Sequence, residues 1–207
     1  MERVYEIGRI FRNEGMDPKH NPEFTSVELY EAYADFNDMM DLFEELLSSA
    51  AQKILGTYQV EWQGEQIDLT PGWPRLSMAE AVKQYVGIDF MAIESDEEAV
   101  AAARAKGIDM DGVEPTWGHA LYESFDQKVE GKLIQPTFIT MHPVDVSPLA
   151  KRSPKDPRVT ERFELFICRS EMGNAFSELN DPIDQRSRFQ KEVEARAKGD
   201  DEAGMMD

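Results

Sequence analysis

The sequence predicts an α+β fold, in which an antiparallel sheet is flanked by helices and interrupted by a mostly helical insertion. Three observations support this prediction. Strand-like alternation runs through 3–7 and returns after a polar loop at 15–20. Apolar residues recur at helical spacing between 39 and 54, and a second set of apolar, strand-like segments lies between 133 and 167.

We expect one domain in three parts. Residues 1–70 form a hairpin, a helix and a following hairpin; residues 71–131 form the helical insertion; residues 132–207 supply the remaining strands, a last helix and a flexible acidic tail. With 207 residues, 41% of them hydrophobic, the chain can bury one good core.

The first hairpin carries a polar face. Arg12 and Glu14 share parity, so a guanidinium and a carboxylate point to one side, where they can hold an anionic ligand. On the returning strand Phe24, Glu28 and Tyr30 share a face. A ring, a cation, a carboxylate and a hydroxyl favour a pocket for a nucleotide and an amine. The alternative is a solvated hairpin whose Arg and Glu pair across the strands.

The residues of this hairpin resemble a known motif. Arg9-Ile10-Phe11-Arg12-Asn13-Glu14 resembles the second signature motif of class II aminoacyl-tRNA synthetases. His20-Asn21-Pro22-Glu23-Phe24-Thr25, with Glu28-x-Tyr30-x-Ala32-Tyr33-Ala34-Asp35, is similar to its lysine-specific, bacterial-type version. The match resumes between Leu133 and Pro182. The resemblance implies the antiparallel sheet of the class II synthetases, in a catalytic-domain segment from the second motif to just before the third.

The next elements are structural. Asn37 is a plausible N-cap for a helix that ends at Gly56, and alternation between 58 and 69 around Gly64 predicts a short hairpin. Capping-box spacing predicts that helices begin at Ser77 and Ser95, and that the second of these ends near Gly107. A third helix is predicted over 117–129.

Residues 133–140 predict another strand. Pro136 indicates that this strand lies at a sheet edge or that the proline is among its first residues. The basic segment 151–158 is a loop, solvated or facing the ATP tail or the tRNA end. Pro182 begins the last helix, which runs to about Lys198.

A pair of acids marks the following strands. Alternation through Phe163, Leu165 and Ile167 leaves Glu164 on the opposite, pocket-facing side. If the chain turns near 167–168, Glu164 and Glu171 become direct cross-strand neighbours, which is destabilising unless a cation neutralises them. Mg²⁺ prefers such carboxylates together with nucleotide phosphates. The alternative is a pair of exposed acids flanking a turn.

Further along, Asn174, Phe176 and Glu178 share parity. A carboxylate at Glu178 opposite the one at Glu28 makes a site for an ammonium group, and Tyr30 and Phe176 can flank an aliphatic stem. That combination describes lysine. Two acids at these positions disfavour the Asp- and Asn-specific relatives.

The resemblance implies a role for each residue. Arg12 is the catalytic residue, which holds the α-phosphate and the lysine carboxylate, and Glu164 and Glu171 are magnesium ligands that also contact ATP. The sequence departs from the family at Cys168 and Ala175, where glycine is more common. The other implied ATP contacts are Glu14, His20, Asn21 and Phe24, and the implied lysine contacts are Glu28, Tyr30, Asn174, Phe176 and Glu178.

Composition bounds the partners. A formal net charge of -19 argues against this chain gripping nucleic acid by itself. The single cysteine, Cys168, excludes an internal disulfide and indicates a small apolar filler. We find no membrane-spanning run and no leader, so the cytoplasm is the expected location.

The resemblance implies ATP, L-lysine and tRNA(Lys) as substrates, Mg²⁺ as cofactor and a homodimer for the full-length protein. We expect the first and third motifs and the anticodon-binding barrel to lie outside this chain, so that the isolated chain has impaired activity. Two rivals stay open: a non-enzymatic paralogue that binds lysine as a regulatory module, and a ligase that attaches lysine to a protein.

Overall fold

The computed structural model describes residues 2–13, 16 and 21–197, and the chain divides into two compact units, Met1–Ala34 and Asp35–Asp207. The first unit is the predicted hairpin. β1 (Arg3–Phe11) pairs antiparallel with β2 (Glu23–Glu31), with Ile10 opposite Phe24 and Glu6 opposite Glu28. The predicted division into three parts stays a prediction.

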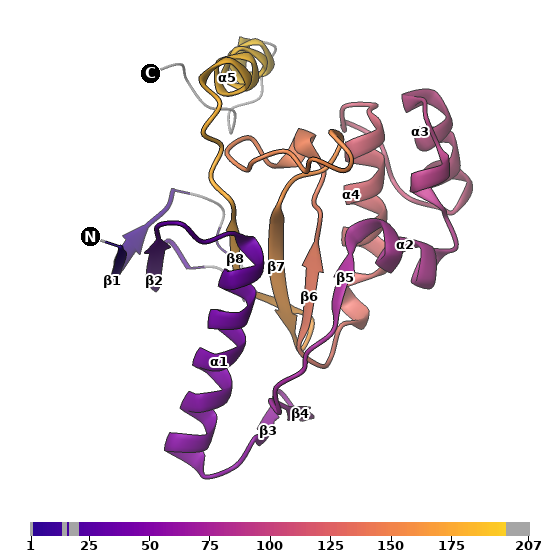
Figure 1. The fold of residues 1–207 in the computed structure, drawn as a ribbon. Coiled ribbons are helices and arrows are strands. Elements are labelled where there is room, and N and C mark those ends of the chain that lie inside the picture. Colours follow the sequence, from indigo (N-terminus) through magenta and orange to yellow (C-terminus); the bar gives the residue numbers. More distant parts are fainter. Residues whose placement is uncertain (1, 14–15, 17–20, 198–207) are drawn as a thin grey trace. The chain divides into compact units, whose positions relative to one another are not determined.

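The second unit is built on a four-stranded sheet (Figure 1). Its order is β5 (Arg75–Ser77), β6 (Thr137–Thr140), β7 (Arg162–Ile167) and β8 (Ser170–Phe176). β6, β7 and β8 pair antiparallel as predicted, whereas β5 joins β6 in parallel. The strand expected over 133–140 is shorter, because Pro136 lies directly before β6 and not among its first residues, and β6 lies inside the sheet, so the edge position is wrong.

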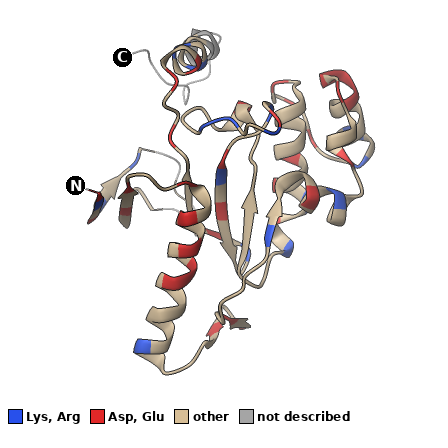
Figure 2. Ribbon diagram, viewed as in Figure 1, with Lys and Arg blue, Asp and Glu red and all other residues tan. Residues whose placement is uncertain are grey.

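Helix α1 (Phe36–Leu55) follows the hairpin unit and packs on β7 and β8. Its N-cap is Asp35, not Asn37 as predicted, because Asp35 accepts from two backbone amides while Asp38 accepts from the Asp35 amide in a reciprocal capping box. Gly56 is the C-cap of the helix, and its φ of 73° suits glycine. Figure 2 shows acidic residues along the helix.

The apolar side of α1 contributes to one of two cores. Phe36 and Met40 pack in this core with the Phe163 and Leu165 face of β7. β3 (Gln59–Trp62) and β4 (Glu65–Asp68), the predicted short hairpin, lie between α1 and the sheet strand β5 in sequence. Ile67 of β4 joins the same core.

The second core lies under the predicted helices. α2 (Met78–Val86) begins at the Ser77 capping box, and Ser95 caps α3 (Asp96–Ala105), which ends two residues before Gly107. α4 (Trp117–Lys128) packs against both helices. Phe166 of β7 belongs to this core, so both faces of β7 are buried.

Short 3₁₀ helices and one last helix complete the chain. The 3₁₀ turns are η1 (Phe90–Ala92), η2 (Glu130–Lys132) and η3 (Val144–Val146), and the last helix is α5 (Pro182–Ala197). Within the described residues, none of the helices has both the length and the apolar character that crossing a bilayer requires.

Candidate functional site

One face of the β1/β2 hairpin collects the residues that the sequence singled out. The register aligns Phe24, Glu28 and Tyr30 on this face, and the guanidinium of Arg12 stacks over the Phe24 ring, with Cζ 5.5 Å from the ring centroid. Ser26 Oγ donates to Glu28 Oε1 over 3.2 Å.

The alternative prediction for this hairpin was that its Arg and Glu residues pair across the strands. Such ion pairs occur on the other face of the hairpin. Arg3 pairs with Glu31 at 2.7 Å and Arg9 with Glu23 at 3.2 Å. The remaining predicted ATP contacts lie in or near the loop between β1 and β2. Asn21 donates through Nδ2 to the Glu23 carbonyl. Two others, Glu14 and His20, lie outside the described residues.

In the second unit, the predicted direct opposition of Glu164 and Glu171 is wrong. Glu164 lies opposite Asn174, and Glu171 lies opposite Phe166. The turn lies at Cys168 and Arg169, both with positive φ, one residue later than expected, and the register shifts again between Leu165 and Phe166.

This shift is a β-bulge that leaves Met172 without a partner in the ladder. A regular ladder would place Gly173 opposite Glu164. The extra residue instead returns Asn174 and Phe176 to the face of Arg162 and Glu164, and Glu171 stays on that face, offset along the strands. Asn174 Nδ2 approaches Glu171 Oε1 at 3.5 Å. The bulge therefore collects predicted site residues on one side of the sheet.

Glu164 is a buried acid, with 8% of its surface exposed. Burial, followed by the repulsion of Glu171, raises its pKa to about 7 against the opposing attraction of Arg162, which donates from Nη2 to Glu164 Oε1 over 2.6 Å. Arg162 also donates to the Val146 carbonyl and to Ser147 Oγ. Glu164 therefore has a cationic partner in Arg162 but a net environment that disfavours its charge.

Two further side chains surround Glu164. His142 Nε2 lies 4.0 Å from Glu164 Oε2, but burial and then Arg162 lower the pKa of His142 to about 3, so the ring is neutral and the contact is not an ion pair. Its Nε2 lies 3.0 Å from the Ile139 carbonyl. Tyr122 of α4 has its pKa raised to about 12 by burial and then by the charge of Glu164.

Sequence reasoning missed these three neighbours of Glu164. Arg162 had a signal, because residues two apart on a strand share a face. His142 and Tyr122 had none, because their proximity depends on loop and helix packing.

Glu178 lies just beyond β8. It forms an isolated antiparallel bridge with Ala150, and the next amide, Leu179 N, donates to the Leu149 carbonyl over 3.0 Å. Partial burial raises the pKa of the Glu178 carboxyl. The backbone of Glu178 thus lies where a short loop segment pairs with the chain just after β8.

The donor set fits a hard cation that shares its ligands with a substrate. Among the described residues, no group of three or more His, Cys, Asp or Glu side chains is placed to hold a metal ion. Glu164 and Glu171 supply two carboxylates on one face, and Mg²⁺ commonly takes one or two carboxylates with phosphate oxygens completing its shell.

The family model for class II tRNA synthetases (D, K and N) matches residues 1–205, and the chain belongs to this family. Lysine–tRNA ligase from Staphylococcus haemolyticus (strain JCSC1435) is 56% identical over all 207 residues, and that of Staphylococcus aureus (strain MRSA252) is 55% identical over the same length. The chain covers 42% of each relative.

Proposed function

We propose that this chain is a catalytic-domain segment of a lysine–tRNA ligase. The complete protein would activate L-lysine with ATP to lysyl-adenylate and transfer the lysyl group to the 3′ end of tRNA(Lys). The observation that carries the proposal is the 55–56% identity to lysine–tRNA ligases along the entire chain, which includes both stretches of candidate site residues.

The lysine-binding role is proposed for residues in each unit. Glu28 and Tyr30 on the hairpin, with Asn174, Phe176 and Glu178 in and after β8, have the acidic and aromatic character that an ammonium group on an aliphatic stem requires. The raised pKa of Glu178 fits a carboxylate that is most stable with a cationic ligand beside it.

The activation step needs no covalent protein intermediate. An oxygen of the lysine carboxylate attacks the α-phosphorus of ATP, the bond from that phosphorus to the bridging oxygen breaks, and pyrophosphate leaves. The protein supplies alignment and charge stabilisation. Arg12 would hold the α-phosphate and the lysine carboxylate in its planar fork. Phe24 would stack on adenine, with Asn21, Glu14 and His20 as further ATP contacts.

Glu164 and Glu171 would hold Mg²⁺. The bound ion would shield the phosphate charges and orient the triphosphate. The raised pKa of Glu164 supports this role, because a cation beside the buried carboxylate would relieve both the desolvation and the repulsion from Glu171.

The test is lysine-dependent ATP–pyrophosphate exchange by a protein that joins this chain to the remaining segments of its longer relatives. We expect exchange with lysine, and Glu178→Gln should raise the KM for lysine about 10- to 150-fold, since a hydrogen bond to a charged group contributes about 1.5–3 kcal/mol. Glu97→Gln, an exposed acid on α3, is the matched control and should leave KM unchanged. Absence of lysine-dependent exchange in the unsubstituted protein would refute the proposal.

The same protein separates the rivals. A regulatory paralogue would bind lysine in calorimetry without exchanging pyrophosphate, and a protein-modifying ligase would exchange pyrophosphate without charging tRNA(Lys). A homodimer and a cytoplasmic location for the complete protein stay part of the proposal.

A further inference from the structure

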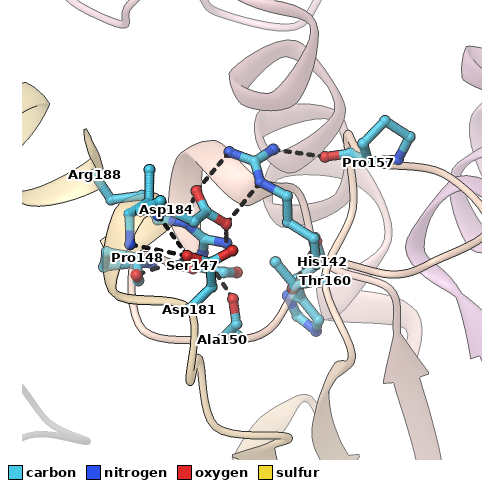
Figure 3. Close-up of polar contacts among 11 residues, drawn as sticks. His142, Ser147, Pro148, Ala150, Pro157, Thr160, Asp181, Asp184 and Arg188 are labelled. Carbon is cyan, nitrogen blue, oxygen red and sulfur yellow. Dashed lines mark hydrogen bonds and ion pairs between the residues drawn. The ribbon is translucent and has the colours of Figure 1, made fainter. Parts of the chain in front are cut away.

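Arg188 of α5 is a buried cation outside the site described above. Only 5% of its surface is exposed, and its Nη1 donates to the carbonyls of Ser147, Ala150 and, more weakly, Pro148 at 2.9, 2.7 and 3.4 Å (Figure 3). A guanidinium with three backbone acceptors in one short segment holds that segment in a defined shape.

Asp184, one turn earlier on α5, completes the anchor. It accepts from Arg188 Nη2 at 2.7 Å and from Arg152 Nε at 2.9 Å, and these guanidinium groups, Arg188 first, hold the pKa of Asp184 well below its usual range. Arg152 also donates to the Pro157 carbonyl. The buried charge of Arg188 is therefore compensated, and α5 is tied to the segment 147–152 from two sides.

The segment 147–152 is also the backbone partner of Glu178. Lys151 N donates to the Ser177 carbonyl over 2.9 Å, Leu179 N donates to the Leu149 carbonyl over 3.0 Å, and Ala150 bridges Glu178 itself. Ala150, whose carbonyl accepts from Arg188, thus pairs with Glu178 directly, and its two neighbours, Leu149 and Lys151, make the backbone hydrogen bonds on either side of Glu178.

We propose that Arg188 is a positioning residue for amino-acid selection: by fixing the segment 147–150 it fixes the place of the Glu178 carboxylate and hence the length of cationic side chain that the site accepts. This inference rests on the proposed function, because it takes Glu178 as a contact of the substrate ammonium group. Arg188 itself does not act on the reacting atoms.

The kinetic test uses the complete protein and two amino acids, L-lysine and L-ornithine, which is one methylene shorter. Arg188→Gln should raise the KM for lysine about tenfold, leave kcat within about threefold and narrow the preference for lysine over ornithine, because a small misplacement of a positioned group is costly. Arg188→Lys keeps the positive charge beside Asp184 and should recover part of the preference.

Arg158→Gln is the matched control. Arg158 also donates to a backbone carbonyl, that of Ile93, and pairs with Asp156, but it does not touch the segment 147–150. A general loss of stability would affect both arginine variants alike, so an equal rise in the lysine KM for Arg158→Gln would overturn the proposal.

Hydrogen exchange on the 207-residue chain tests the tether without relying on the proposed activity. Arg188→Gln should speed exchange of the Lys151 and Leu179 amides about tenfold relative to Arg158→Gln. If Arg188→Gln does not fold, Asp184→Asn weakens the same anchor and should act in the same direction.

The outcomes are distinguishable. Unchanged exchange at both amides overturns the tether, and faster exchange with an unchanged lysine-to-ornithine preference overturns its role in selection. If the unsubstituted complete protein exchanges no pyrophosphate with lysine, the proposed function fails and takes the role in selection with it, while the amide rates still report on the tether.

Discussion

Glu164 illustrates how the surroundings of one residue change its chemistry. On a solvated strand its carboxyl would ionise near the ordinary value of 4.5, but burial and the nearby Glu171 raise the pKa to about 7 despite the Arg162 guanidinium. The alternation in the sequence predicted the side of the strand on which Glu164 lies. It did not predict burial on that side, where Phe166 joins the core under α2, α3 and α4 and the buried His142 lies beside Glu164.

At this scale we predict the titration of Glu164 in the metal-free chain. Carboxyl-carbon NMR should show a Glu164 pKa of about 7. Arg162→Gln should raise this pKa further, because it removes the attraction that favours the anion, and Glu171→Gln should lower it, because it removes a repulsion. Titration of Glu164 near 4.5 would contradict the structure.

The raised pKa of Glu164 also determines how the stability of the fold changes with pH. The folded-state pKa lies above the unfolded one, so the native state binds the extra proton between about pH 4.5 and 7. The contribution of Glu164 to the free energy of unfolding therefore falls as the pH rises through this window. Glu164→Gln should flatten this part of the profile in denaturant titrations at several pH values.

At the scale of elements, capping signals and periodicity predicted where helices and strands lie, whereas the pairing register of β7 and β8 was not predicted. The boundaries near Gly56 and Ser77 follow from local backbone requirements and were confirmed. The N-cap of α1 is Asp35 and not the predicted Asn37, because the side chains of Asp35 and Asp38 each accept a hydrogen bond from the other residue's backbone amide. The bulge at Met172 was not predictable from alternation, because alternation assumes an unbroken ladder.

The packing of α1 on β8 gives a prediction at this scale. A Cβ on Gly173 would lie 2.9 Å from two ring carbons of Phe43, whose ring packs edge-on against Phe163 with centroids 6.5 Å apart. Gly173→Ala should therefore destabilise the chain by about 1–3 kcal/mol through overpacking, measured by urea unfolding. Gly131→Ala is the control, since a Cβ there meets nothing within 4 Å. Equal stability of the two variants would contradict the packing.

The whole molecule consists of two units that differ in how much of their side-chain surface is buried. The hairpin unit has two strands with largely exposed side chains, such as Tyr5 at 72% and Ile7 at 65%. In the second unit every residue of β6 is buried, and two cores cover the sheet. A two-stranded hairpin has little stability of its own, whereas a sheet covered on both faces opens only with the global fold.

We therefore expect native-state hydrogen exchange to separate the units. The amides of β1 and β2 should exchange at least about 100-fold faster than those of β6 and β7 under the same conditions. Similar protection in both units would show that they unfold together.

The sequence by itself determined the order and type of nearly all elements, the side of the hairpin on which Arg12 and Phe24 lie, and the family, because these depend on local periodicity, capping and motif. Only the tertiary structure decided the parallel strand β5, the offset of Glu164 from Glu171, and the role of Arg188 as an anchor. Each of these depends on contacts between segments distant in the chain, and their burial and bonding energies are not encoded in the pattern of any single segment.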